Sequence, residues 1–536
     1  MQADNTTSSS ALAPLAHPVF RMLWSAWLIA NTCMWMNEVA AAWLMTSLTT
    51  SPVMVALVQT ASTLPVFMLG LPSGALADIL DRRRYLMFTQ FWVAGVAVLI
   101  SITVASGTMS ARMLLLLTFA NGIGLAMRMP VFAAIVPGLV PRTQLAPAIA
   151  LNGVAMNASR IIGPIIAGAL IASAGSVYVF ALNAVLSVVA GFVILRWKHE
   201  PTPSALPGER FLGAIRVGVQ FVRQSSRMHT VLLRVALFFL QSIAVLALLP
   251  LVARALPGGD ARSYTLLLAC LGVGAIGAAL LLPRLRQRME FDRVVRDGTL
   301  LQSAATAVVA FAPNVAVAAA GMIVAGAAWL AVANTLSVSA QLSLPDWVRA
   351  RGMSIYQMAL MGSSAAGAAL WGQVASLTDL RASLVLAAAS GTLALPLVRR
   401  FKLAATAVED LTPVHDLVPP VPGRPVAPDA GPVLVTIEYR IDPARSAEFN
   451  AVMQATRRSR LQRGALAWEL FHDASEAGRY IEYVIDENWV EHLRRFDRLT
   501  AGDAALREQR LALHVGDGPP VVSRFIAEPP GQAASK

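Results

Sequence analysis

The sequence predicts an all-α membrane protein with twelve transmembrane helices in two six-helix halves, followed by a small α+β domain of ferredoxin-like topology. Three observations support this fold class. The chain has 536 residues, of which 56% are hydrophobic and only 14% charged, whereas soluble proteins are about 25% charged. Apolar stretches of membrane-spanning length recur up to residue 400, and charged residues become frequent after residue 430. This composition excludes an ordinary soluble enzyme and a disordered chain.

The formal net charge of +12 is unevenly distributed along the chain. Residues 1–430 contain 29 basic and 16 acidic residues, and residues 431–536 contain 14 basic and 15 acidic residues. The membrane part therefore carries the whole positive excess. A basic soluble domain would suggest a nucleic-acid partner. Here the excess lies on the loops of a membrane protein, so we expect the lipid bilayer as a partner and no nucleic acid.

Twelve apolar stretches account for the membrane part, because a spanning helix needs about 20 predominantly apolar residues. Six stretches form an N-terminal half at residues 1–195, and six form a C-terminal half at residues 229–402. Short polar links make successive stretches antiparallel neighbours. The predicted spans are residues 20–46, 52–77, 86–106, 112–136, 148–173, 176–195, 229–254, 262–283, 294–312, 315–341, 353–376 and 381–400.

The longest interruption, residues 196–228, separates the two halves. Within it, apolar residues recur at the spacing of one helical face, namely Phe211, Leu212, Ile215, Val219 and Val222. Arginines at positions 210, 216, 223 and 227 surround that face. We therefore expect a basic amphipathic helix at the membrane surface, within a cytoplasmic central loop.

Basic residues are distributed asymmetrically between the two sides of the predicted membrane part. If the N-terminus is cytoplasmic, the inside segments hold 21 Lys and Arg residues and the outside loops hold four. Because basic loops stay in the cytoplasm, we expect the N-terminus and the C-terminal domain to be cytoplasmic. The polar N-terminus lacks the basic region of a signal peptide. Cys33 and Cys270 lie in apolar stretches, so we expect no disulfide, no metal site and no cofactor.

The loop after the second span, GALADILDRRRYL, resembles the signature loop of the major facilitator superfamily. That signature has Gly, then Asp four residues later, then Arg-x-Gly-Arg-Arg. The matching residues are Gly74, Asp78, Arg82 and Arg83. Ile79 and Asp81 depart from it, and the corresponding loop of the second half has Leu281 where Asp would stand. The resemblance implies a charge network that latches the two halves in one state and releases them in another. The alternative is that these arginines only anchor the loop inside.

The fifth span contains NASRIIGPIIAGAL, in which Gly163, Pro164 and Gly168 resemble the Gly-Pro motif of superfamily exporters of the antiporter type. Glycine lets helices approach closely, and proline bends a helix. Plain helix packing is the alternative explanation. Residues 17–526 are similar to the subgroup that contains the bacterial enterobactin exporter and the transmembrane secretion effectors, with FRMLWSAWLIANTCMWMNEVAAAWLM as one matching segment. The resemblance implies proton-driven export of a siderophore- or drug-like small molecule across the bacterial inner membrane.

Glu38 lies well inside the first predicted span, where an ionisable residue is costly and usually faces a cavity or a partner. Asn31, Trp35 and Glu38 are spaced four and three residues apart, so they share one helical face. We predict that Glu38 titrates with the proton flux. The alternative is a static buried residue.

Two arginines also fall within predicted spans. Arg128 lies in the fourth span, and Arg160 lies in the fifth span near Asn157. We expect one of these arginines to tune the acidity of Glu38 or to bind an anionic group of the substrate. The alternatives are a static buried pair and an end residue that snorkels to the surface. The resemblance implies that the first and fourth spans line the substrate cavity.

The C-terminal part has the pattern of a soluble domain. Residues 403–430 are a Pro-rich linker, and residues 431–530 form the predicted domain. Alternation predicts strands at 433–441, 465–473, 479–487 and 520–527. Helical periodicity predicts helices at 443–462, 489–499 and 504–514. This βαββα…β order is ferredoxin-like.

The predicted domain resembles the small dimeric α/β-barrel domains of the antibiotic-biosynthesis monooxygenase type. The resemblance implies a homodimer formed through this domain. The domain has no metal-ligand spacing, and we expect His492 to be a polar helix-surface residue rather than a general base. We therefore interpret the domain as a dimerisation or regulatory module.

The leading hypothesis is a proton-coupled secondary active exporter of a small molecule, not an enzyme. One alternative is a membrane-anchored monooxygenase-like enzyme that acts through the C-terminal domain, although twelve spans exceed what an anchor requires. Another alternative is an importer of the same fold. The sequence lacks a Gly-x-x-x-x-Gly-Lys-Ser/Thr loop, which argues against ATP-driven transport. It does not identify the substrate, the proton stoichiometry or the oligomeric state.

Overall fold

The computed structural model describes residues 12–136, 139–141, 144–197, 211–286, 288–403, 410–412, 414, 420 and 422–528. The chain divides into two compact units. The first, called the helical unit below, comprises Met1–Gly208, Val231–Ser339 and Ser354–Ala404. The second, called the tail unit below, comprises Glu209–Thr230, Ala340–Met353 and Ala405–Lys536. The tail unit thus contains two segments of the predicted membrane part in addition to the C-terminal domain.

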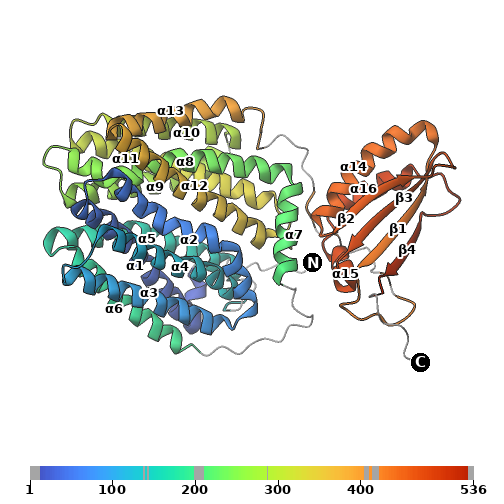
Figure 1. Cartoon of the computed structure of the whole chain (residues 1–536), viewed down its shortest axis with the longest axis horizontal. Helices are drawn as coiled ribbons and strands as arrows, with labels where there is room; N and C mark the ends of the chain where they lie inside the picture. The colour runs from blue at the N-terminus through green and yellow to red at the C-terminus, as the bar shows by residue number, and fades with distance from the viewer. Residues whose placement is uncertain are drawn as a thin grey trace, which may run out of the picture. The chain divides into compact units, whose positions relative to one another are not determined.

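Long helices make up the helical unit (Figure 1). Each apolar stretch predicted from the sequence coincides with one of them. Side chains at positions 81, 110 and 379 accept hydrogen bonds from the first backbone N–H groups of three of these helices, which fixes where those helices begin. The bounds are α1 (Pro18–Leu48), α2 (Pro52–Ile79), α3 (Arg82–Ala105), α4 (Ala111–Ile135), α5 (Leu145–Ser173), α6 (Ser176–Leu195), α8 (Ser226–Ala255), α9 (Ala261–Arg286), α10 (Phe291–Ala310), α11 (Val315–Leu342), α12 (Arg349–Leu377) and α13 (Leu380–Val398).

Among the described residues, nine helices are long and apolar enough to cross a membrane, namely α2–α6, α8, α9, α11 and α13. Helices α1, α10 and α12 are not among these nine, and α1 carries Asn31, Asn37 and Glu38. Large apolar side chains point outward from α3 and α6, and more than half of the surface of each of these is exposed: Phe88, Leu99, Ile102, Val185 and Phe192. An apolar exterior of this kind suits a lipid environment, and the protein is a multi-pass membrane protein.

The helices of the two predicted halves meet within the helical unit. The Thr60 hydroxyl on α2 donates to the Ala365 carbonyl on α12 over 2.9 Å. The Arg254 guanidinium on α8 donates to the Thr46 carbonyl on α1 over 2.6 Å. A buried apolar cluster contains residues of both halves, including Met36, Met45, Leu248, Leu267 and Trp371. The halves are therefore joined by packing and by hydrogen bonds between side chain and backbone.

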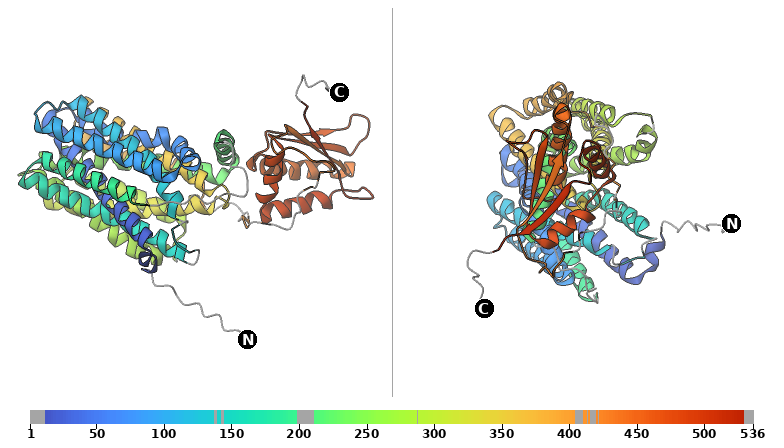
Figure 2. Two further views of the ribbon diagram at one scale, coloured as in Figure 1. Left: turned by 90° about the horizontal axis from the view of Figure 1, so that it is seen from below. Right: turned by 90° about the vertical axis from the view of Figure 1, so that its right-hand side faces the viewer.

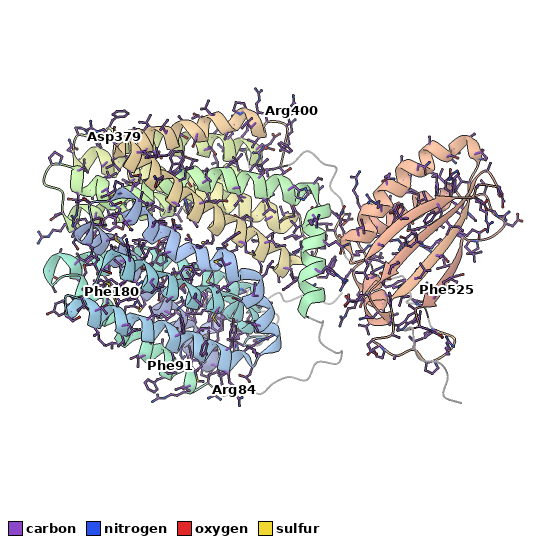
Figure 3. The ribbon with its side chains drawn as sticks, viewed as in Figure 1. Arg84, Phe91, Phe180, Asp379, Arg400 and Phe525 are labelled. Carbon is purple, nitrogen blue, oxygen red and sulfur yellow. The ribbon has the colours of Figure 1, made fainter. Side chains whose placement is uncertain are left out.

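Two basic residues and one acidic residue at helix ends lie toward opposite ends of the helical unit. In Figure 3, Arg84 at the start of α3 and Arg400 after α13 lie toward one end of the unit, and Asp379 before α13 lies toward the other. Both arginines belong to segments that the sequence analysis assigns to the inside. Basic segments of a membrane protein with a single orientation are expected on one side of the membrane, and these two segments do lie toward the same end of the unit.

The described C-terminal residues form a four-stranded sheet in the order β2-β3-β1-β4. The strands are β1 (Val433–Arg440), β2 (Ala467–His472), β3 (Arg479–Asp486) and β4 (Val521–Ile526). All three pairings are antiparallel, and Val433 on β1 lies opposite both Asp486 on β3 and Ile526 on β4. The sheet is central to what we call the tail domain, residues 422–528.

Helices of the tail domain cover one face of this sheet (Figure 2). They are α14 (Ser446–Gln462), α15 (Trp489–Asp497) and α16 (Ala501–Ala512). A short 3-10 turn, Pro443–Arg445, precedes α14, and another, Ala13–Ala16, precedes α1 in the helical unit. Alternate residues of β1 are buried against this layer, including Val433, Val435 and Tyr439, together with Phe449 and Met453 of α14. The predicted strands and helices therefore all occur, with ends that differ by a few residues.

The predicted central-loop helix also occurs, as α7 (Phe211–Gln224), and it belongs to the tail unit. Its location at the membrane surface stays a prediction. Parts of the predicted linker are hydrogen-bonded to the tail domain, because Ala501 N–H donates to the Thr412 carbonyl and Trp489 N–H donates to the Ala430 carbonyl, over 2.9 and 2.8 Å. These described parts of the linker are therefore ordered by backbone contacts.

Candidate functional site

Glu38 lies in the middle of α1, with groups from both halves around it. The Gln59 side chain on α2 forms a hydrogen bond with its carboxylate, and Arg160 on α5 is the cation that acts on it. Tyr264 on α9 also lies within electrostatic reach of the carboxylate. Because α9 belongs to the second half, the Glu38 carboxylate lies where the two halves meet. The structure thus brings Glu38 and Arg160 close to each other.

Two tryptophans hold the Arg160 guanidinium. Its Cζ atom lies 3.8 Å from the ring centroid of Trp329 on α11 and 5.5 Å from that of Trp35 on α1. A guanidinium over the face of an aromatic ring is attracted by the electron-rich π system. Trp35 was selected from the sequence because it shares a helical face with Glu38. Trp329 was missed, since a tryptophan in a span has no local signature that separates packing from a cation contact.

Arg128 occupies a different place from the Glu38 site. Only 3% of its surface is exposed, and its Cζ atom lies 5.3 Å from the ring centroid of Trp27. Trp27 in turn stacks on Phe132, with ring centroids 3.9 Å apart. The Asn31 amide donates to the Trp27 carbonyl over 2.8 Å. Of the two arginines considered as partners of Glu38, the structure therefore places Arg160 beside it, and Arg128 in an aromatic cluster. The side chain of Asn157 lies outside the described residues.

Gly163 and Gly168 lie at close helix contacts on opposite sides of Pro164. A Cβ atom on Gly163 would lie 2.6 Å from the Cβ of Trp35 on α1, beside the Glu38 site. A Cβ atom on Gly168 would lie 1.8 Å from the Thr265 hydroxyl oxygen on α9. Real side chains do not approach so closely, so only glycine fits at these two positions. The motif thus packs α5 against a helix of each half.

The predicted latch loop joins α2 to α3. The Arg83 guanidinium donates to the Leu195 carbonyl at the end of α6 over 2.6 Å, which is a contact within one half. Asp81, which departs from the family signature, accepts a hydrogen bond from the Arg84 N–H over 2.8 Å and caps α3. A Cβ atom on Gly74 would meet no atom within 4 Å. Arg82 begins α3, and the side chain of Asp78 lies outside the described residues. A role of this loop in latching the halves stays a prediction.

A buried carboxylate organises the helical face of the tail domain. Glu482 on β3 is fully buried and accepts hydrogen bonds from Arg460, Trp468 and Tyr439, over 3.0, 2.9 and 3.0 Å. Burial alone would raise the pKa of Glu482, but the positive charges of Arg460 and Arg510 and these hydrogen bonds hold that pKa at about 2. Glu482 is therefore ionised at neutral pH and is a structural centre of the domain.

His492 is buried, so the expectation of a helix-surface residue is wrong. Only 1% of its surface is exposed because α15 packs this residue against β3. Its Nδ1 atom lies 2.8 Å from the Asp486 carboxylate, and its Nε2 atom accepts a hydrogen bond from Arg524 over 3.2 Å. Burial lowers the pKa of His492 below its ordinary value, although the Asp486 carboxylate opposes that shift. Both ring nitrogens are thus engaged in structural contacts, and no lone pair remains for a general base.

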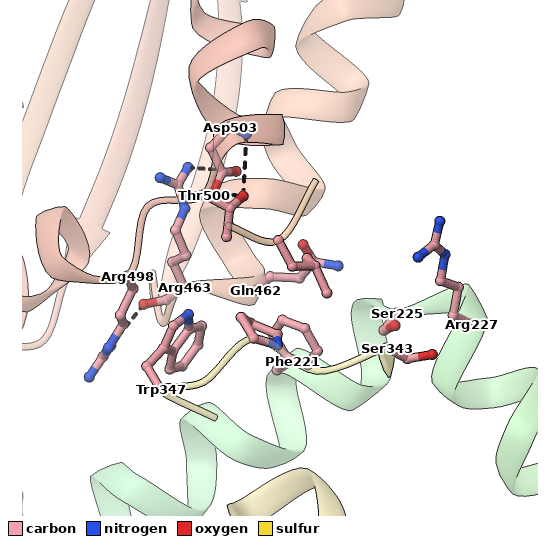
Figure 4. Close-up of a pocket in the computed structure, with 12 residues that line it drawn as sticks. Phe221, Ser225, Arg227, Ser343, Trp347, Gln462, Arg463, Arg498, Thr500 and Asp503 are labelled. Carbon is pink, nitrogen blue, oxygen red and sulfur yellow. Dashed lines mark hydrogen bonds and ion pairs between the residues drawn. The ribbon is translucent and has the colours of Figure 1, made fainter. Parts of the chain in front are cut away.

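Two clefts lie in the tail unit, next to α7. The smaller has a volume of about 20 Å³ and is lined by residues including Phe221, Trp347 and Arg498 (Figure 4). The larger has a volume of about 300 Å³ and is lined mostly by polar residues of α14, α16 and the start of α8. Among the described residues, no group of three or more His, Cys, Asp or Glu side chains is placed to hold a metal ion.

Solved structures with a similar fold are membrane transporters. The nucleoside transporter NupG matches 72% of this chain and 98% of its own, with a TM-score of 0.58 and 13% sequence identity. The Escherichia coli fucose:proton symporter matches 72% of this chain and 98% of its own, with a TM-score of 0.51 and 15% identity. At these identities the likeness shows the fold alone, which is the fold of the major facilitator transporters.

Curated relatives are similar to part of the chain. The staphyloferrin A transporter of Staphylococcus aureus is 22% identical over 253 residues, which is 47% of this chain and 63% of that protein. The macrolide efflux protein A of Streptococcus pyogenes is 23% identical over 242 residues, which is 44% of this chain and 58% of that protein. The chain thus spans about three-fifths of the length of the curated relatives it matches. A family model described as "Transmembrane secretion effector" matches residues 9–531, and the chain therefore belongs to the transmembrane secretion effector family.

Proposed function

We propose that the chain is a proton-coupled secondary active exporter of a small molecule, which works by alternating access in the bacterial inner membrane. In this proposal α1, α10 and α12 cross the membrane together with the nine apolar helices, and the N-terminus and the tail domain are cytoplasmic. The observation that carries the proposal is the Glu38–Arg160 pair, which is surrounded by helices of both halves. The fold and the relatives favour a transporter over an enzyme.

The position of the pair provides a coupling mechanism. A carboxylate inside a membrane is costly unless it is paired or protonated. When Glu38 is ionised, its attraction to Arg160 favours the arrangement in which α1, α5 and α11 are close together. When Glu38 binds a proton, that attraction is lost and the contacts of Arg160 with Trp35 and Trp329 remain. Because Arg160 also lies on Trp329 of the second half, release of Arg160 from Glu38 changes the contact between the halves, which is what coupling to alternating access requires.

The substrate class rests on the relatives. Those named above are a transporter of staphyloferrin A and an efflux protein for macrolides. We infer a siderophore- or drug-like substrate of similar kind, and an outward direction of transport. An aromatic pair around a guanidinium suits a ligand with carboxylate groups or flat polar surfaces.

The test is transport by the purified protein in proteoliposomes. Erythromycin, as a macrolide, and staphyloferrin A serve as probes, and the protein is oriented inside-out with an acidic lumen. An exporter that exchanges substrate for protons accumulates the probe in the lumen, whereas an importer that moves both together needs the opposite gradient. We expect Glu38→Gln to abolish accumulation driven by the pH gradient while the protein stays folded.

The matched control is Asp297→Asn, which removes an exposed carboxylate from α10 that pairs, among the described residues, with its neighbour Arg296. We expect this variant to transport at the rate of the unmodified protein. Gradient-driven accumulation that is the same in Glu38→Gln and in the unmodified protein would contradict the role of Glu38. Comparison of secreted and retained metabolites in a deletion strain then identifies the natural substrate.

For the tail domain we propose a ferredoxin-like fold and a homodimer. The order of strands and helices and the strand order β2-β3-β1-β4 support that fold class. The face of the sheet opposite the helices has exposed apolar side chains: Phe471, Phe525 and Val521 are 55–65% exposed. A second copy of the same face offers an apolar surface of matching extent.

A further inference from the structure

The tail domain is in direct contact with two connecting segments of its own chain. One is α7, which precedes α8 in the sequence. The other is the segment Ala340–Met353, which joins α11 to α12 and belongs to the tail unit. We propose that the tail domain is a clamp that binds these two segments together and thereby restrains their movement.

The contacts with α7 form one stripe along this helix. The three α7 residues involved are four positions apart, so they lie on the same helical face. The contacts run from position 216 to position 224 of α7, which is the end of this helix. The hydrogen bonds are Arg216 Nη2 to Glu487 Oε2 at 2.6 Å, Gln220 Nε2 to the Ala465 carbonyl at 2.7 Å, and Gln462 Nε2 to the Gln224 carbonyl at 3.3 Å.

Trp347, which belongs to the segment Ala340–Met353, contacts both α7 and the tail domain. Its ring meets the Phe221 ring of α7 edge to face, with centroids 5.8 Å apart and an interplanar angle of 88°. The Arg498 guanidinium of the tail domain lies on Trp347, with its Cζ 5.2 Å from the ring centroid. Arg498 is fixed by hydrogen bonds to Glu491 and to the Arg463 carbonyl, over 2.9 and 2.8 Å. The indole therefore packs between α7 and the tail domain (Figure 4).

The contact is closely packed. The cleft around Phe221 and Trp347 encloses about 20 Å³, which is room for about one water molecule. A Cβ atom on Gly218 of α7 would lie 2.9 Å from the Cβ of Arg351, in the segment Ala340–Met353. Any larger residue at position 218 would therefore push α7 away from that segment. Each polar contact is weak by itself. Together with this packing, the polar contacts hold α7, the segment Ala340–Met353 and the tail domain to one another.

The consequence for transport rests on the proposed function. The helix α7 lies in the connection between the two six-helix halves, and the segment Ala340–Met353 connects two helices of the second half. If the halves move relative to each other during transport, these connections must move as well. A domain that binds both connections slows this movement, so the clamp acts as a brake on the transport cycle.

Amide hydrogen exchange of the full chain tests the clamp without any substrate. The first variant is Arg216→Gln combined with Trp347→Ala, and the second is Gly218→Val as a wedge. We expect the amides of α7 and of residues 343–348 to exchange at least tenfold faster in both variants, and those of β1 and β3 to keep their protection. Arg440→Gln is the control, because it breaks an exposed ion pair with Glu476 elsewhere on the domain and leaves these rates unchanged.

The outcomes separate the clamp from the transporter function. If exchange in α7 and in residues 343–348 is unchanged in both variants, the clamp is wrong. If exchange rises and the initial rate of probe transport rises at least twofold, with the pH gradient still required, the brake is supported. If exchange rises and the transport rate does not change, the regulatory role is wrong. If no variant and no unmodified protein transports either probe while exchange rises, the proposed function fails and the clamp stands.

Discussion

Glu38 illustrates how far a single residue in a sequence can be interpreted. Its position inside a predicted span marks it as costly, and the three-residue spacing places Trp35 on the same face. Both inferences use only the order of residues along one helix. Gln59, Tyr264 and Trp329 surround the same site from three other helices. No local pattern identifies them, because contacts between distant helices depend on how the helices pack.

His492 shows the opposite case, in which a local pattern misleads. The segment NWVEHLRRF is rich in charged residues and predicts a solvated helix. In the structure His492 and Arg495 of α15 face inward, and Asp486 on β3 and Arg524 on β4 supply the partners of His492. A buried polar group is tolerated when its hydrogen bonds are satisfied. The partners lie 6 and 32 residues away, so their pairing depends on the sheet register.

The Glu482 network predicts a pH-dependent stability of the tail domain. The pKa of Glu482 is about 2 in the folded domain, below its ordinary value of about 4.3 in an unfolded chain. A lowered pKa stabilises the fold above the unfolded value, and this stabilisation of about 3 kcal/mol is lost as the pH falls from about 4.5 toward 2. We expect amide exchange of β1 and β3 in the full chain, corrected for intrinsic rates, to accelerate over this pH range.

The substitution Glu482→Gln tests the same network at neutral pH. It leaves Arg460, whose side chain is 14% exposed, without its ion-pair partner, and we expect it to destabilise the tail domain by about 3–5 kcal/mol. Glu476→Gln changes an exposed carboxylate of the same domain and should alter its stability by less than about 0.5 kcal/mol. Equal protection of β1 and β3 in the two variants would mean that the network contributes little.

At the scale of elements, helix positions follow from the sequence because span length is a physical requirement of the bilayer. The strands of the tail domain follow from the alternation of buried and exposed residues, as in β1 and β3. The grouping of elements does not follow in this way. The contact between Arg216 and Glu487 joins residues 271 positions apart, and neither residue has a local signature. The association of α7 and the segment Ala340–Met353 with the tail domain is therefore visible only in the structure.

The contact between α5 and α9 makes a prediction at this scale. A Cβ atom on Gly168 would lie 1.8 Å from the Thr265 hydroxyl oxygen and 2.4 Å from its Cβ. We expect Gly168→Ala to force α5 away from α9 and to destabilise the protein by about 1–3 kcal/mol, which is typical of overpacking. The measurement is the apparent midpoint of thermal unfolding in detergent.

Two further variants make this prediction specific to the contact. In the double variant with Thr265→Gly, the obstructing side chain is absent, so part of the lost stability should return. Gly95→Ala is the control, because a Cβ atom there meets no atom within 4 Å. If Gly168→Ala melts at the same temperature as Gly95→Ala, α5 and α9 do not depend on this close approach.

At the scale of the whole molecule, composition and charge are the sequence features that best predict the architecture. The separation of a basic, apolar part from a nearly neutral part predicts a membrane protein with a soluble domain. The structure adds that basic segments far apart in the sequence, at Arg84 and Arg400, lie toward one end of the helical unit (Figure 3). The excess positive charge thus has a structural explanation as a topology signal. The identity of the transported molecule depends on side-chain contacts that neither composition nor topology encodes.

The oligomeric state is the prediction that belongs to the molecule as a whole. Phe471 on β2 and Phe525 on β4 are each 55% exposed on the tail domain, and exposed aromatic side chains on a sheet face favour association. We expect the detergent-solubilised full chain to be a dimer by light scattering coupled to size-exclusion chromatography.

The double variant Phe471→Glu and Phe525→Glu should be a monomer, because four carboxylates would be buried at the two-fold contact without partners. Val515→Glu, a change at a 63% exposed position of the tail domain outside the sheet, should leave the dimer intact. A monomeric unmodified chain, or a double variant that still forms dimers, would show that the open face of the sheet does not bind a second copy.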